Sequence, residues 1–161
     1  MKTRLTLAAL TLGAAILAGA IPGNDALGAE SPFHGSRVTV ESGKSFEDVS
    51  KALTNLVAEN GMMVMADVDQ GNMLSMTGLK LKAHLFIVGS PTVGKQLFER
   101  NHAVGLYVPL RVFVYTDADN KTFVEYDKPS SLLAQFQDEK ITEVAQMLDQ
   151  KMEALAGMAA Q

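Results

Sequence analysis

The chain has 161 residues, no cysteine, and 14 basic against 18 acidic side chains, which gives a net charge of −4. The absence of cysteine excludes thiol catalysis, cysteine-ligated zinc, iron–sulfur clusters and covalent c-type haem. The acidic balance and the lack of a basic cluster disfavour nucleic-acid binding, because contacts to phosphates need clustered Lys and Arg.

The first twenty residues have the pattern of a secretory signal peptide. Lys2 and Arg4 form a positive start, and residues 5–21 form an uncharged run rich in Ala, Leu and Gly. Small residues at 18–20 supply a cleavage pattern, and positions 28–29 supply a weaker one. A retained membrane anchor is the alternative, but the run is short for a bilayer span and only weakly hydrophobic. We expect a periplasmic or secreted protein with no membrane span in its mature chain of about 140 residues.

The mature chain begins with a leader and a strand–helix pair. Pro and Gly residues at 21–35 predict a flexible leader before a single domain at 36–157. Alternating apolar residues predict a strand at 37–41. Ser45-Phe46-Glu47-Asp48 has the spacing of a capping box, and the apolar residues that follow form one helical stripe. Gly61 is a suitable end for this helix.

The middle of the domain predicts two strands and a short helix. Residues 62–68 predict a strand, and the polar residues at 69–72 predict a turn after it. Residues 80–88 predict a third strand, which is most hydrophobic at its end. A short helix is expected at 91–100, because Pro suits the first turn of a helix.

The last third predicts a hairpin and a long helix. Residues 104–115 predict a strand that Pro109 interrupts, and 121–126 predicts its partner across a turn. Residues 139–157 predict an amphipathic helix. The order is therefore β-α-β-β-α-β-β-α. It predicts an α+β domain in which helices cover one face of a mostly antiparallel sheet.

The stretch from Gly89 to Gln96 is one residue short of a phosphate-binding P-loop. Gly89, Gly94 and Lys95 have the spacing of that motif, between a predicted strand and a predicted helix. Gln96, however, stands where the motif needs a Ser or Thr hydroxyl for Mg²⁺. The predicted strand order is not one of repeated βαβ units, and exported proteins have no nucleotide pool. We interpret the stretch as a tight strand-to-helix turn with an exposed lysine.

Five methionines lie within fifteen residues: Met62, Met63, Met65, Met73 and Met76. Thioethers are soft ligands that suit Cu(I), so Met63, Met65, Met73 and Met76 are candidate copper ligands. The simpler interpretation is that these methionines fill irregular core space or form a surface for a partner. The sequence therefore assigns no metal to them.

Three histidines, His34, His84 and His102, lie far apart in the sequence. Histidine is a common metal ligand and a possible axial ligand of haem. No two of these residues have the spacing of a helical ligand pair. We expect His84 to be partly buried and hydrogen-bonded within its strand, and we expect no cofactor.

Arg111 stands between Leu110 and Val112 in a hydrophobic strand. Strict alternation places its side chain on the outward face; the alternative is an arginine that pairs with a buried carboxylate. Glu125 and Tyr126 lie at a strand end, where they could act as acid or base if burial shifted their pKa values. The sequence contains no Gly-x-Ser-x-Gly motif and no clear Ser-His-Asp arrangement, so no residue is assigned as catalytic.

The central segment resembles the family called domain of unknown function 302. Residues 86–95, Phe-Ile-Val-Gly-Ser-Pro-Thr-Val-Gly-Lys, resemble the family's hydrophobic strand, its Phe-Gly-Asn-Pro turn and the Gly-Thr that follows. Residues 108–115 resemble its Leu-Pro-Leu-Lys/Arg-Val-Leu-Val run, and 123–129 resemble its Tyr-x-x-Pro ending. The chain departs from the pattern at Tyr107, where the family often has Asp, and at Ser90 and Lys95, which replace Asn and Thr.

This resemblance implies a TATA-box-binding-protein-like α+β fold that often forms a homodimer. The name of that fold describes topology and implies no DNA binding. The family has no agreed activity and no agreed catalytic residues, so none is carried over to this chain.

We therefore expect a non-enzymatic exported domain that binds a small ligand or a protein partner, as a homodimer. The candidate binding residues are Arg111, Tyr126 and His84. The contact surface is expected on the hairpin at 108–126 and on the methionine-rich turn. One alternative is copper or haem binding through methionine and His84. Another is an enzyme that uses Glu125, Tyr126 or Arg111.

Overall fold

The computed structural model describes residues 36–161. The predicted signal peptide, the predicted leader and His34 lie outside the described residues. The elements are β1 Arg37–Ser42, α1 Phe46–Glu59, β2 Met63–Asp69, α2 Gln70–Ser75, β3 Ala83–Gly89, α3 Pro91–Phe98, the 3-10 helix η2 His102–Leu106, β4 Leu110–Thr116, β5 Thr122–Asp127, α4 Pro129–Leu133, the 3-10 helix η3 Ala134–Phe136 and α5 Glu139–Ala160.

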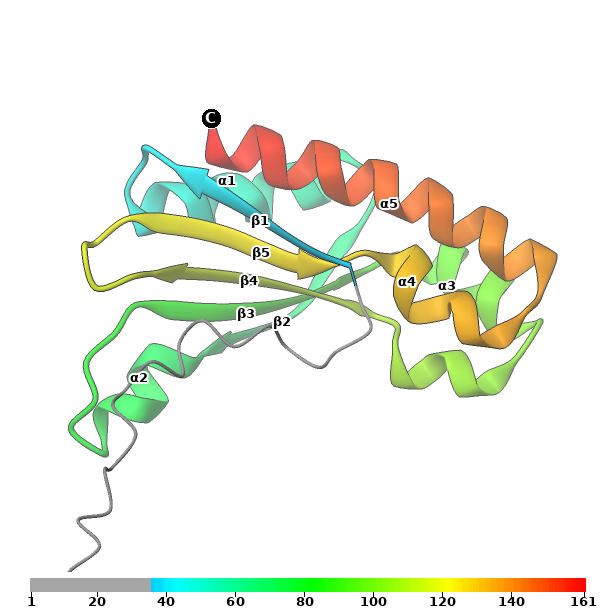
Figure 1. Cartoon of the computed structure of the whole chain (residues 1–161), viewed down its shortest axis with the longest axis horizontal. Coiled ribbons are helices and arrows are strands. Elements are labelled where there is room, and N and C mark those ends of the chain that lie inside the picture. The colour runs from blue at the N-terminus through cyan, green and yellow to red at the C-terminus, as the bar shows by residue number, and fades with distance from the viewer. Residues whose placement is uncertain (1–35) are drawn as a thin grey trace, which may run out of the picture. The chain divides into compact units, whose positions relative to one another are not determined.

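The strands form one antiparallel sheet in the order β1-β5-β4-β3-β2 (Figure 1). Helices α1 and α5 pack against each other and cover one face of the sheet. The α+β prediction is therefore confirmed. Among the described residues, no helix is both long and apolar enough to cross a membrane.

The core lies between the sheet and these two helices. Alternation along the strands turns Val112, Val114 and Val124 inward, where each is at most 1% exposed. The buried residues of α5 recur with helical spacing and meet them: Ile141, Val144, Ala145, Leu148, Met152, Leu155, Ala156, Ala159 and Ala160. Burial of this apolar area is the main force that holds the long helix on the sheet, at about 25 cal/mol per Å².

The helix start predicted at Ser45 is confirmed. The Ser45 hydroxyl accepts a hydrogen bond from the Asp48 backbone N–H at 3.1 Å and donates one to the Asp48 carboxylate at 2.7 Å. The first of these bonds satisfies a backbone N–H that the first turn of a helix leaves unpaired. Gly61 follows the helix with a φ of +66°, a conformation that favours glycine.

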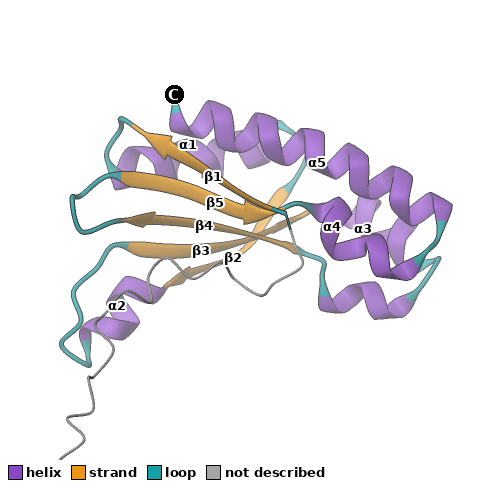
Figure 2. Ribbon diagram, viewed as in Figure 1, coloured by secondary structure: helices purple, strands orange, loops and turns teal. Residues whose placement is uncertain are grey.

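The turn predicted at 69–72 was wrong, because a helix begins there. Asp69 caps α2, and its carboxylate accepts a hydrogen bond from the Asn72 backbone N–H at 2.7 Å. Figure 2 shows α2 as a short helix between β2 and β3. Asp and Asn favour both turns and helix starts, so their presence did not separate the two outcomes.

Two predicted strands began too early, and the short helical segments η2, α4 and η3 were not predicted. The third strand starts at Ala83 rather than at residue 80. The fourth starts at Leu110, because Val104 lies in η2, whose first turn is capped by the Asn101 side chain. Pro109 precedes the strand and so removes no bond from the sheet. Helix α4 begins at Pro129, a favoured first position.

Gly71 of α2 provides a test of the packing around that helix, and Gly94 of α3 is its control. A Cβ added at Gly71 would collide with the Leu81 carbonyl oxygen, whereas a Cβ at Gly94 meets no atom within 4 Å. We expect Gly71→Ala to lower the free energy of unfolding by about 1–3 kcal/mol. Gly94→Ala should raise it by up to about 1 kcal/mol, because alanine favours helix. Urea unfolding measures both values, and equal stabilities would contradict this packing.

Candidate functional site

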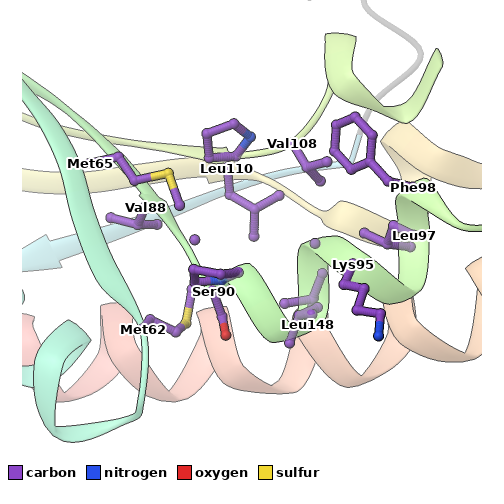
Figure 3. A pocket seen from close by; sticks show the side chains of 15 residues that line it. Met62, Met65, Val88, Ser90, Lys95, Leu97, Phe98, Val108, Leu110 and Leu148 are labelled. Atoms are coloured by element: carbon purple, nitrogen blue, oxygen red, sulfur yellow. The ribbon is translucent and has the colours of Figure 1, made fainter. Parts of the chain in front are cut away.

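A cavity of about 420 Å³ lies at the end of the sheet where β3 leads into α3. Figure 3 shows it between the first turns of α3, the start of β4 and helix α5. Its lining residues are Met62, Met65, Val88, Gly89, Ser90, Pro91, Val93, Gly94, Lys95, Leu97, Phe98, Val108, Pro109, Leu110 and Leu148. Segments far apart in the sequence therefore build its wall.

The Gly89-Ser90-Pro91 turn shapes this cavity. Gly89 ends β3, Ser90 is extended at the N-cap position, and Pro91 begins α3. A Cβ at Gly89 would lie 3.1 Å from the Met65 Cε and 3.2 Å from the Pro109 Cβ, so any larger residue would push these side chains apart. The prediction of a strand-to-helix turn is confirmed here.

The lysine of the near P-loop does not reach into the cavity. The Lys95 side chain is 74% exposed, and its Nζ lies 3.6 Å from a carboxylate oxygen of Glu99, one helical turn further on. In Figure 3 the Lys95 amine and the Ser90 hydroxyl both point away from the centre of the cavity. The cavity wall is therefore almost entirely apolar. Among its described lining residues there is no His, Asp or Glu that could act as acid or base.

Of the four candidate copper ligands, the structure brings only Met65 to the cavity. The pairing of β2 with β3 shifts register between Val64 and Ala66, which leaves Met65 in a bulge. Met63 pairs with Gly89 and is 54% exposed, while Met73 and Met76, on and just after α2, are more exposed still. Within residues 36–161, no group of three or more His, Asp or Glu side chains could hold a metal ion.

His84 lies at a different place, on the helix-covered face of β3. Its Nδ1 is 2.8 Å from the Asp67 Oδ1, its Nε2 is 3.5 Å from the Asp69 Oδ2, and its ring meets the Phe46 ring edge-on. The Nδ1 approach lacks hydrogen-bond geometry, and this atom has no hydrogen-bond partner among the described residues. The contact with Asp67 therefore becomes an ion pair only when the imidazole is protonated.

Arg111 lies on the opposite face of the sheet, which α1 and α5 leave uncovered. It is exposed, and it borders a second concavity of about 620 Å³, here called the outer groove. The groove is also lined by Arg37, Gln70, Leu85, Leu106, Tyr107, Phe113, Glu125, Tyr126, Asp127 and Leu132. Arg37 is paired within it, with its Nε 3.0 Å from Asp127 and 3.5 Å from Glu125. Arg111 makes no salt bridge to a residue that the structure describes.

Tyr126 borders the outer groove but belongs to the core. It is 4% exposed, one residue beyond the outward-facing Glu125 on β5. Burial, together with the nearby carboxylates Glu153 and Asp149 of α5, raises the pKa of Tyr126. A phenol held neutral in this way is a packing residue and a poor base. Arg111, Tyr126 and His84 therefore do not converge on one site.

Sequence reasoning missed the cavity. The sequence pattern indicates a phosphate loop or a turn at Gly89 and Lys95, and a copper ligand or a core residue at Met65. Gly89 at the end of β3 and Gly94 in α3 are small residues that leave space near this junction. Their pattern does not indicate which distant side chains surround that space.

The sequence and the fold both have known relatives. Residues 38–158 match the family described as "Domain of unknown function DUF302". The crystal structure of an uncharacterized conserved DUF302 protein from Bacillus stearothermophilus superposes with a TM-score of 0.71 at 19% identity, over 78% of this chain and 98% of that one.

Longer curated proteins also match part of the chain. The fluoride-specific ion channels FluC 1 of Brucella suis and FluC 2 of Brucella melitensis are each 30% identical over 96 residues, 59% of this chain. The matched region spans only 38% and 36% of those proteins, respectively. The family match, in contrast, covers nearly all the described residues, and the chain belongs to the DUF302 family.

Proposed function

We propose that this protein is a non-enzymatic binding domain that takes a small, mainly apolar molecule into the cavity beside the Gly89-Ser90-Pro91 turn. The observation that carries this proposal is the cavity itself, which has a volume of about 420 Å³, an almost entirely apolar wall and an opening to solvent. That volume lies in the range of about 300–1,000 Å³ that is typical of ligand pockets. Covering its wall would stabilise a complex by about 25 cal/mol for each Å² of apolar surface removed from water.

The mouth of the cavity supports a ligand rather than a packing defect. Met65 and Phe98 line the cavity, yet they are 48% and 41% exposed. Large apolar side chains exposed at a concave surface are the usual mark of a binding site. A bound molecule would cover both side chains. The signal-peptide pattern at residues 1–20 supports export, so we place this binding outside the cytoplasm.

Fluoride, the ion named for the curated relatives, does not suit this cavity. A small and strongly hydrated anion needs cations or N–H donors to replace its water. The cavity has apolar walls, and the Lys95 amine at its rim lies near Glu99. Fluoride therefore serves as a negative control in any ligand screen of this domain.

A blocking substitution at Gly94 tests the cavity. We expect the protein to bind N-phenyl-1-naphthylamine, a neutral fluorescent probe, and Gly94→Phe to weaken this binding about tenfold or more by filling the space beside α3. The matched control is Gly157→Phe, because Gly157 is also helical, also has no atom within 4 Å of an added Cβ, and lies outside the cavity. Fluorescence titration measures both affinities, and equal affinities would refute this site.

For the outer groove we propose a second copy of the chain as the partner. Arg37, Glu125 and Asp127 form a cluster of one cation and two carboxylates, with a net charge of −1. Arg111 borders the same groove, and Leu106, which also lines the groove, is 74% exposed. A two-fold interface would bring Arg111 of each copy to the carboxylate cluster of the other, because such an interface uses one patch twice. Charge complementarity thus favours a homodimer.

Charge reversal at Arg111 tests this homodimer. We expect sedimentation equilibrium to show a dimer, and Arg111→Glu to weaken it about tenfold or more, because the new carboxylate would face the acidic cluster of the other copy. Lys51→Glu makes the same change of charge on exposed α1 and should leave the dimer intact. A monomeric wild type, or equal effects of the two variants, would contradict the interface.

A further inference from the structure

Met65 places an accessible thioether in the wall of the apolar cavity. Its side chain is 48% exposed, and its Cε lies 3.1 Å from where a Cβ at Gly89 would stand. The bulge in β2 leaves Met65 without a partner residue on β3, and Figure 3 shows its sulfur at the cavity. Met62, the other sulfur in this wall, is only 6% exposed. Only one of the two cavity methionines is therefore open to solvent.

We propose that Met65 is an oxidation site, and that its conversion to methionine sulfoxide by a small two-electron oxidant such as hydrogen peroxide closes the cavity to its ligand. The sulfur lone pair attacks one peroxide oxygen, the O–O bond breaks, and the departing hydroxide takes the remaining proton to form water. Sulfur is oxidised by two electrons and peroxide is reduced. This inference rests on the proposed ligand-binding function.

The polarity of the sulfoxide is the physical reason for closure. Oxidation turns a flexible apolar side chain into a polar one that accepts hydrogen bonds. The described wall of the cavity offers that oxygen no inward-pointing side-chain donor, because Ser90 and Lys95 point away. The oxygen then keeps its water at the mouth, and an apolar ligand must remove that water in order to bind.

A bound ligand should in turn slow the oxidation of Met65. The reason is steric, because the ligand covers the exposed thioether and keeps peroxide away from the sulfur. Met63 is an internal reference for this effect, because it lies two residues away on β2 and is 54% exposed, yet does not line the cavity.

The experiment treats the purified protein with hydrogen peroxide, maps oxidation by peptide mass spectrometry and titrates N-phenyl-1-naphthylamine. We expect Met65 to oxidise much faster than Met62, and affinity to fall about tenfold or more as Met65 oxidises. Met65→Leu removes the sulfur at a similar side-chain volume, so its affinity for the probe should be the same before and after peroxide treatment. Met63→Leu should respond as the wild type does. Saturating probe should slow oxidation of Met65 relative to Met63.

Three results separate the failure of the switch from the failure of the function. If the reduced protein binds the probe, but full oxidation of Met65 leaves its affinity unchanged, the switch is wrong and the binding function stands. The same holds if Met65→Leu still loses affinity with peroxide, because another methionine is then responsible. If the reduced wild type does not bind the probe, the proposed function is wrong. The switch is then wrong as well, because it depends on ligand binding.

Discussion

The close approach of three chain segments at Gly89 is the constraint on which the candidate site depends. β2, through Met65, and the segment before β4, through Pro109, both pack where a side chain at Gly89 would stand. A residue with a Cβ would push the Met65 and Pro109 side chains away by a few tenths of an ångström. Because Pro91 then begins α3 immediately, the helix leaves the sheet beside this contact. The space between the helix and the strand ends is the cavity.

Alternation along the strands places neighbouring residues on opposite faces of the sheet. Neighbouring residues on a strand face opposite sides, so Glu125 lies on the outer face while Tyr126 is buried under α5. The same alternation along β4 exposes Arg111 between two buried residues. Glu125 and Tyr126 are adjacent in sequence, but the first faces the outer groove and the second packs in the core. The carboxylate of Glu125 and the phenol of Tyr126 therefore lie in different environments.

Periodicity predicted most of the fold, because β4, β5 and the long helices α1 and α5 each bury one face of their own sequence. The inward residues of β4 and β5 and the buried stripe of α5 needed no knowledge of their partners. The start of α2 was missed because Asp69 suits a turn and a helix cap equally. The cavity could not be predicted, since Met65, Leu110 and Leu148 meet only through the order of strands and the path of α5. Local pattern carries no information on such contacts between distant segments.

Met65, at the mouth of the cavity, combines a flexible side chain with a sulfur that can be oxidised. A leucine at position 65 would fill a similar volume, but its branched side chain adapts less well to a bulged strand and to a changing occupant. An unbranched thioether can follow both, and that flexibility suits a wall that opens to solvent. The sulfur that supplies this softness is also the atom that oxidants attack. Adaptability of the binding wall and sensitivity to oxidation therefore come from one atom, and a residue that removed the second property would lessen the first.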